Sequence, residues 1–263
     1  MSNLQKERII KEKLQNLIER IRVMKEIDAN YVVMRVKRLV DKLQQRGICS
    51  IDKFLQKLFD SAHNKEDYLD ILMEGRFAII LARNKFSEIH IEYCEAGPDL
   101  KANYNDNTVY FEITRRRPTE DDQAIQSRAA FVSRDRAENI ISKIQGKLRQ
   151  LQNDEINIVV VWSDTIRLSQ HELEKAFEYI KQEIKDDPEK YKDLGGVLFT
   201  EGGGVDVATL KQFYLFKNDN ASKPLGTRLA EKLESLHEQN PKKLQKEWEA
   251  IAAAIKRLEL RGN

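Results

Sequence analysis

The sequence has no long hydrophobic run and few cysteines or prolines. Of its 263 residues, two are cysteine and five are proline. The longest apolar stretches are Phe77–Ala82 and Ile158–Trp162, far below the roughly 18 residues that a membrane-spanning helix needs. The polar first residues carry no apolar core like that of a secretory signal. We therefore expect a soluble, cytoplasmic protein that does not insert into a membrane.

The scarcity of cysteine also excludes several kinds of site. Cys49 and Cys94 fall in different predicted elements and lack the close spacing of metal or redox motifs. In a reducing cytoplasm, two buried free thiols are the expected state. The sequence predicts neither a disulfide nor a zinc site.

A large excess of charge of one sign is missing as well. The chain has 45 Lys and Arg against 43 Asp and Glu, for a net charge of +2, and 41% of its residues are hydrophobic. This balance excludes a tail-like polycation and a disordered chain. The charges are unevenly placed, because residues 1–48 carry a net +6 and residues 115–149 a net +4. Contact with a polyanion would therefore use localised basic patches.

Apolar residues at helical spacing occupy both ends of the chain. In residues 1–48 they form two runs separated near Asp28, which predict one long helix or two. A similar stripe runs from Leu244 to Leu258. Such stripes fit packing against the chain's own core, or a homodimer joined by a short coiled coil through the terminal helices. The sequence leaves both interpretations open.

The centre of the chain mixes helix and strand signals. Asn64 is a predicted cap for a helix, and a continuous β-branched run is typical of a strand buried on both faces. The expected elements are helices over 51–59, 65–84, 121–152 and 169–184, and strands over 88–93, 99–103, 108–114, 156–162, 197–200 and 210–216.

This order predicts an α/β fold with a mixed central sheet flanked by helices. We divide the chain into a helical N-terminal region (residues 1–63), an α/β core (64–220) and C-terminal helices (221–263). The long terminal helices are additions to the core.

Two acidic residues stand out in the three-strand region. Asp99 follows Gly97-Pro98, where a new strand must begin, and Glu112 sits inside an otherwise apolar strand. A buried carboxylate is costly unless it is paired or bound to a metal. Two carboxylates at the ends of neighbouring strands can hold one hard cation, such as Mg²⁺ or Mn²⁺. The pair therefore predicts a metal site.

The pairs Pro98-Asp99 and Glu112-Ile113-Thr114 resemble the signature of the PD-(D/E)xK, or restriction-endonuclease-like, nuclease superfamily. The predicted order of helix, three strands, helix and strand over residues 65–163 is similar to the common core of that family. The resemblance implies a restriction-endonuclease-like fold and hydrolysis of phosphodiester bonds, with DNA as the expected partner. It also implies that Asp99 and Glu112 bind the metal.

The resemblance extends to an acid on the helix before the first strand, and Glu74 matches it as an accessory metal ligand. The sequence departs from the family at Thr114, where the motif has a lysine that orients or activates the attacking water. A threonine hydroxyl can donate a hydrogen bond but carries no charge. The expected substitute is either Lys101, on the same strand face as Asp99, or Lys147, on the following helix.

Three arginines, Arg115, Arg116 and Arg117, directly follow the strand of Glu112, where they are placed to contact DNA phosphates. The leading hypothesis is thus a magnesium-dependent endonuclease.

Structural roles for the two acids are also compatible with the sequence. Glu112 is then a structural carboxylate paired with one of Arg115–Arg117, and Asp99 caps a turn. Two other functions fit the sequence: an inactive nuclease-like protein that binds nucleic acid, suggested by Thr114, and a dimeric scaffold built on the terminal helices.

Overall fold

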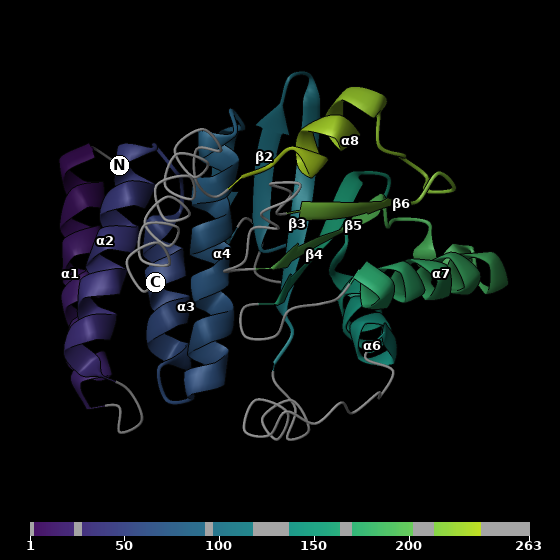
Figure 1. The fold of residues 1–263 in the computed structure, drawn as a ribbon. Helices are drawn as coiled ribbons and strands as arrows, with labels where there is room; N and C mark the ends of the chain where they lie inside the picture. Colours follow the sequence, from purple (N-terminus) through teal and green to yellow (C-terminus); the bar gives the residue numbers. More distant parts are fainter. Residues whose placement is uncertain are drawn as a thin grey trace, which may run out of the picture.

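A single sheet lies between layers of helices in this computed structural model (Figure 1). The structure describes residues 3–23, 28–92, 97–117, 137–163, 170–201 and 213–237. In chain order the described elements are α1 (Asn3–Arg22), α2 (Ala29–Gln45), α3 (Ile51–Ser61), α4 (Lys65–Arg83), β1 (Ser87–Ile91), β2 (Leu100–Tyr104), β3 (Asn107–Arg115), α6 (Ala137–Lys147), η1 (Leu148–Gln150), β4 (Ile156–Ser163), α7 (Gln170–Asp186), η2 (Glu189–Tyr191), β5 (Gly196–Glu201), β6 (Phe213–Lys217) and α8 (Thr227–Glu234).

The described strands form one six-stranded sheet in the order of the chain, β1-β2-β3-β4-β5-β6. The strands β1, β2 and β3 are antiparallel, β3, β4 and β5 are parallel, and β6 is antiparallel to β5. Parallel neighbours need crossover connections, and these carry α6 and α7. The mixed sheet confirms the expected α/β class.

Each face of the sheet has its own hydrophobic core. On one face, Phe111 of β3 packs edge-on against Phe77 of α4, with ring centroids 5.3 Å apart. On the other face, Val159 and Val161 of β4 pack with α6 and α7. Because β4 is buried on both faces along its whole length, its β-branched run has no polar alternation.

The N-terminal residues form two helices rather than one. Asp28 accepts a hydrogen bond from the Tyr31 backbone N–H at 3.2 Å and so caps α2. Leu17 and Val36 belong to the same hydrophobic cluster as the sheet residues, so this stripe packs against the chain's own core. That cluster also includes Leu229 of α8, and it therefore spans all three predicted parts of the chain.

One expectation is wrong: Cys49 is exposed, because it lies in the segment that leads from α2 to α3. In the described residues the predicted helix over 121–152 begins at Ala137 and ends at Lys147, followed by a 3₁₀ turn. Residues 118–136, Cys94, Ser169 and the stripe from Leu244 lie outside the described residues. Within the described ranges, the helices are too short or too polar to cross a membrane.

Candidate metal centre

Asp99 sits where β3 extends beyond its neighbour. The pairing of β2 with β3 ends at Leu100 and Phe111, so the next backbone groups of β3 have no partner in β2. The carboxylate of Asp99 supplies an acceptor in place of a β2 carbonyl. Its Oδ2 accepts a hydrogen bond from the Ile113 N–H at 2.8 Å. Asp99 is only 8% exposed. The break at Gly97-Pro98 thus places a fixed, buried carboxylate at the end of the sheet.

Glu112 lies beside this position on β3 and is 1% exposed. Its Oε1 accepts a hydrogen bond from the Lys147 Nζ of α6 at 2.5 Å. Its Oε2 is buried and makes no hydrogen bond within the described residues. Burial, together with the nearby charge of Asp99, raises the pKa of Glu112 to about 8, although Lys147 acts in the opposite direction.

A second group of acids surrounds Lys57 of α3. Its Nζ lies 2.9 Å from Glu74, 2.6 Å from Glu92 and 3.1 Å from Asp99. Burial alone would lower the pKa of Lys57, but the three carboxylates more than compensate and raise it well above its usual value. Burial and the charge of Asp99 raise the pKa of Glu74, against the effect of Lys57. One oxygen from each acid lies within 4.8 Å of the other two.

Asp99 joins the two groups into one centre. Its Oδ1 contacts Lys57, and its charge also raises the pKa of Glu112 and of Lys147. Four carboxylates therefore share two ammonium groups, an excess of two negative charges when all are ionised. Burial and the nearby charge of Asp99 favour the protonated forms of Glu74 and Glu112, whose pKa values are raised.

This donor set fits a hard divalent cation. The four acids offer carboxylate oxygens, which Mg²⁺ and Mn²⁺ prefer. The Oε2 atom of Glu112 has no partner among the described residues, and a buried oxygen of this kind is a ready metal ligand. A divalent cation would also replace the positive charge that protons otherwise supply.

The structure brings together four of the six predicted catalytic residues: Glu74, Asp99, Glu112 and Lys147. The other two lie further along the sheet. Lys101 pairs with Tyr110 on the face of Glu112, about 7 Å along β2 from Asp99. Thr114 is buried, and it pairs with Val161 two residues beyond Glu112.

Lys57 and Glu92 were missed by the sequence analysis. Lys57 lies 42 residues from Asp99 and 35 from Glu92, so no local spacing connects them. The sequence contains only two weak indications of their role. Glu92 ends the alternating pattern of β1, and Lys57 is flanked on α3 by the buried residues Phe54 and Leu58.

The three arginines after β3 differ in their surroundings. Arg115 turns away from Glu112 toward α4, where it bonds to Glu66 and, at 2.6 Å, to Asp70. Its side chain is 2% exposed, whereas that of Arg117 is 40% exposed and pairs with the α4 residues Asp67 and Asp70 at 2.6 Å each.

Arg116 is also buried, and its backbone N–H donates to the Trp162 carbonyl at 2.7 Å. Of the three, Arg117 alone keeps a substantially exposed side chain. The carboxylate of Glu112 pairs with Lys147. This differs from the alternative interpretation of the sequence, in which Glu112 pairs with one of Arg115–Arg117.

The centre thus combines four acids and two lysines. They come from α3, α4, α6 and β3, from the residue after β1 and from the residue before β2. These residues are far apart in the sequence. They lie close together where β3 extends beyond the end of its pairing with β2. No model of a protein family, no curated protein and no solved structure matches this chain.

Proposed function

We propose that the protein is a metal-dependent endonuclease that hydrolyses DNA phosphodiester bonds. The observation that supports this most is the meeting of Asp99, Glu112 and Lys147. One carboxylate directly precedes β2 and the other lies within the adjacent strand β3, where an ammonium group contacts it at 2.5 Å. This is the combination that the resemblance to the PD-(D/E)xK superfamily implies, with the lysine supplied by α6 instead of β3.

In this proposal, Asp99 and Glu112 hold the cation, and Glu74 supports it from α4. The bound Mg²⁺ or Mn²⁺ would bind the scissile phosphate and acidify a water molecule. Asp99 is oriented by the Ile113 N–H, so its ligand oxygen needs little reorganisation. Glu112 must lose its proton before its free Oε2 can act as a ligand.

Lys147 acts in this scheme as a charged donor. Its pKa is raised, because the charges of Asp99 and Glu112 outweigh the effect of burial, so the ammonium group keeps its protons at neutral pH. A group in that state cannot remove a proton from water. It can orient the water and offset the negative charge that develops on the phosphate. Thr114 then needs no catalytic charge of its own.

The test is cleavage of supercoiled plasmid and linear DNA with Mg²⁺ or Mn²⁺. The wild type is compared with Asp99→Ala and Glu112→Ala, and with Asp106→Ala in the exposed turn between β2 and β3 as a matched control. We expect cleavage by the wild type and the control, and a loss of at least about 10²-fold in the two site variants. Equal rates in all four proteins would refute the proposal.

A second function is favoured by Lys57. Its ammonium group lies between Glu74, Glu92 and Asp99, where a cation would bind, and Thr114 replaces the motif lysine. A nuclease-like protein with a permanently filled centre would bind nucleic acid without cutting it. This alternative predicts salt-sensitive DNA binding that Asp99→Ala leaves unchanged, with no cleavage under any metal.

A further inference from the structure

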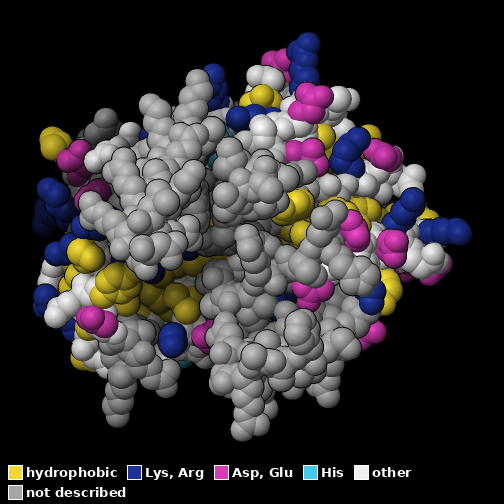
Figure 2. Space-filling model, viewed as in Figure 1, with side chains coloured by type: hydrophobic (Ala, Val, Ile, Leu, Met, Phe, Trp, Pro, Cys, Tyr) yellow, Lys and Arg dark blue, Asp and Glu magenta, His cyan; other side chains and the backbone are white. Residues whose placement is uncertain are grey.

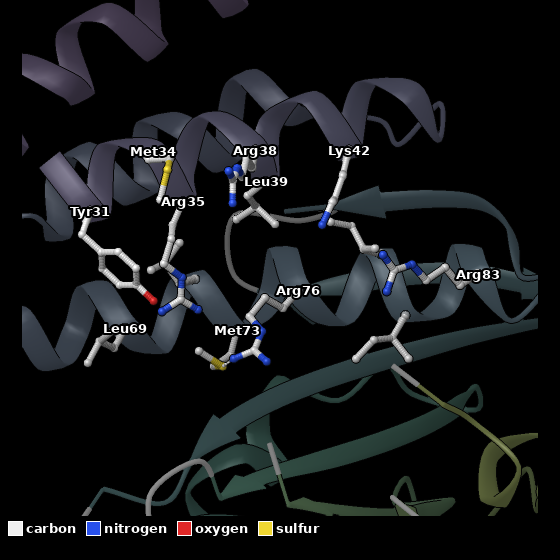
Figure 3. Close-up of a pocket in the computed structure, with 13 residues that line it drawn as sticks. Tyr31, Met34, Arg35, Arg38, Leu39, Lys42, Leu69, Met73, Arg76 and Arg83 are labelled. Atoms are coloured by element: carbon white, nitrogen blue, oxygen red, sulfur yellow. Dashed lines mark hydrogen bonds between the residues drawn. The ribbon is translucent and has the colours of Figure 1, made fainter. Parts of the chain in front are cut away.

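A second site lies between α2 and α4, on the side of α4 away from Glu74. It is a groove of about 460 Å³, and Figure 3 shows Arg35 and Lys42 directed from α2 toward α4. Apolar side chains such as Leu39 and Ile80 form its floor. None of the described lining residues is acidic. Five of them are cations: Arg35, Arg38, Lys42, Arg76 and Arg83.

Helical spacing explains why the cations gather there. Arg35, Arg38 and Lys42 lie at positions i, i+3 and i+7 of α2 and therefore share one face. On α4, Arg76 and Arg83 are also seven residues apart. Each row extends about 10 Å along its helix. The groove is therefore lined along its length by positive charge.

The α2 row is available to a ligand. Arg35, Arg38 and Lys42 are exposed, and none of them forms an ion pair with a residue in the described part of the chain. The Arg35 guanidinium lies 5.5 Å from the ring centroid of Tyr31, which limits its freedom before any ligand binds. Figure 2 shows apolar side chains beside Lys and Arg on the α1–α4 side of the molecule.

Electrostatics decides which class of ligand fits. The like charges of Arg35, Arg38 and Lys42 repel each other, and a bound anion would relieve that repulsion. A single phosphate would neutralise one or two of the cations. The α2 row, about 10 Å long, calls for negative charges repeated along a line, which the phosphates of a nucleic acid supply. Tyr31, 51% exposed, and Met34, 40% exposed, offer an apolar surface for a sugar or a base.

We infer that this groove binds the phosphate backbone of a nucleic acid. The inference rests on the proposed function, since it names a surface that would hold the substrate away from the metal centre. Arg76 marks the sheet side of the groove, because its guanidinium lies 5.1 Å from the ring centroid of Trp162 on β4. Trp162 is three residues past Val159, the β4 partner of Glu112. That end of the groove therefore lies about 10 Å along the sheet from the level of Glu112. It lies on the opposite face, because Trp162 packs in the core on the α4 side, whereas Glu112 contacts α6.

The test compares two triple variants with the same change in charge. The groove variant is Arg35→Gln, Arg38→Gln and Lys42→Gln. The control is Arg8→Gln, Arg20→Gln and Lys37→Gln, which removes three exposed cations from α1 and α2 outside the groove. Binding of fluorescent duplex and single-stranded DNA is measured by anisotropy with EDTA, over a series of salt concentrations. Thermal unfolding checks that both variants are folded.

We expect the groove variant to bind DNA at least about 10-fold more weakly than the control at low salt. Its plot of log affinity against log salt should lose a slope of about 2 to 3, because each phosphate contact contributes about 0.9. An unchanged slope, or equal losses in the two variants, would overturn the inference. So would binding of anionic phospholipid vesicles with no binding of DNA.

The two proposals fail separately. If no metal supports cleavage but the groove variant loses DNA binding, the nuclease proposal falls and the groove stands. If the wild type cleaves DNA but the groove variant binds it like the control, the groove falls and the nuclease stands. Inorganic phosphate is a further probe. Competition by it in the millimolar range, together with an unchanged salt slope, would indicate a small-anion site and would overturn the backbone assignment.

Discussion

The ammonium nitrogen of Lys147 lies 2.5 Å from Oε1 of Glu112, although the two residues are 35 positions apart. The contact connects the last turn of α6 to the middle of β3, across the face of the sheet that α6 covers. A lysine on a helix therefore places its charge next to the carboxylate of a strand. The motif lysine of the PD-(D/E)xK superfamily would come two residues after Glu112, where this chain has Thr114.

Replacing Lys147 should affect cleavage more than any other lysine of α6. We expect Lys147→Ala to lower the cleavage rate by about 10²- to 10³-fold, because it removes the charge that offsets the developing negative phosphate. Lys147→Arg keeps a positive charge and should recover part of the rate. Lys143→Ala, at an exposed position of the same helix, should leave the rate unchanged. Similar losses in Lys143→Ala and Lys147→Ala would rule out a specific role for Lys147.

Lys57 should be replaceable by a metal ion. Lys57→Met leaves Glu74, Glu92 and Asp99 without their shared cation, and we expect it to lower the free energy of unfolding by about 2 to 3 kcal/mol in EDTA. Mn²⁺ should restore part of that loss, because an ion that binds only the folded state stabilises it. The measurement is urea unfolding with and without Mn²⁺.

Lys53→Met, at an exposed position one turn earlier on α3, is the matched control for this experiment. It should be close to the wild type in stability and in its response to Mn²⁺. A Lys57→Met protein that gains no more from Mn²⁺ than this control would show that the acids around Lys57 do not bind the metal.

The pKa of Glu112, raised from 4.5 to about 8 by burial and by Asp99, predicts a pH dependence. Between these values the folded chain holds a proton that the unfolded chain has released. The stabilising effect of that proton is therefore complete below about pH 4.5 and is lost as the pH rises to about 8. Metal binding must displace the same proton, so affinity for Mg²⁺ should increase with pH up to about 8 and then level off.

Asp99→Asn tests the cause of this shift, since it removes the charge but keeps an acceptor for the Ile113 N–H. In the metal-free protein, NMR titration of the glutamate side-chain carbons should show a lower pKa for Glu112 in Asp99→Asn than in the wild type. Asp106→Asn, in the exposed turn, should not change it. A wild-type Glu112 that titrates near 4.5 would contradict the prediction.

Much of the fold follows from local patterns. The burial of β4 on both faces is already visible in its β-branched run, and the caps Asp28 and Asn64 mark the starts of α2 and α4. Asp99 and Glu112 could be selected because each acid interrupts a pattern, one at a chain break and the other in an apolar strand. Hydrophobic periodicity indicates which side chains of a single helix or strand are buried, so it predicts features that lie within one element.

Contacts between distant elements could not be read in the same way. Lys57 meets Asp99 only because α3 packs beside α4 and β1, and the cations of α2 and α4 line one groove only after those helices pack together. The arginine run shows the same limit. Three adjacent arginines look equivalent in the sequence. Arg115 and Arg117 both pair with Asp70 of α4, but the side chain of Arg115 is buried and that of Arg117 is 40% exposed.

That difference predicts opposite effects for two neighbouring substitutions. Arg115→Gln removes a buried partner from Asp70 and Glu66 and should lower the free energy of unfolding by about 2 to 3 kcal/mol. Arg117→Gln affects an exposed network and should cost at most about 1 kcal/mol. If the arginine run contacts DNA, Arg117→Gln should reduce the salt slope of DNA binding by about 1. Arg115→Gln should leave that slope unchanged, because its guanidinium is shielded from solvent.

Urea unfolding and anisotropy titrations of the two proteins separate these effects. Lys53→Gln, which removes one exposed positive charge from α3, serves as a control of equal charge. A large loss of stability in Arg117→Gln would contradict a mainly DNA-binding role for Arg117. A reduced salt slope in Arg115→Gln would contradict a purely structural role for Arg115. The expected outcome confines the direct DNA contact of this segment to Arg117, whose two carboxylate partners, Asp67 and Asp70, must then exchange it for a phosphate.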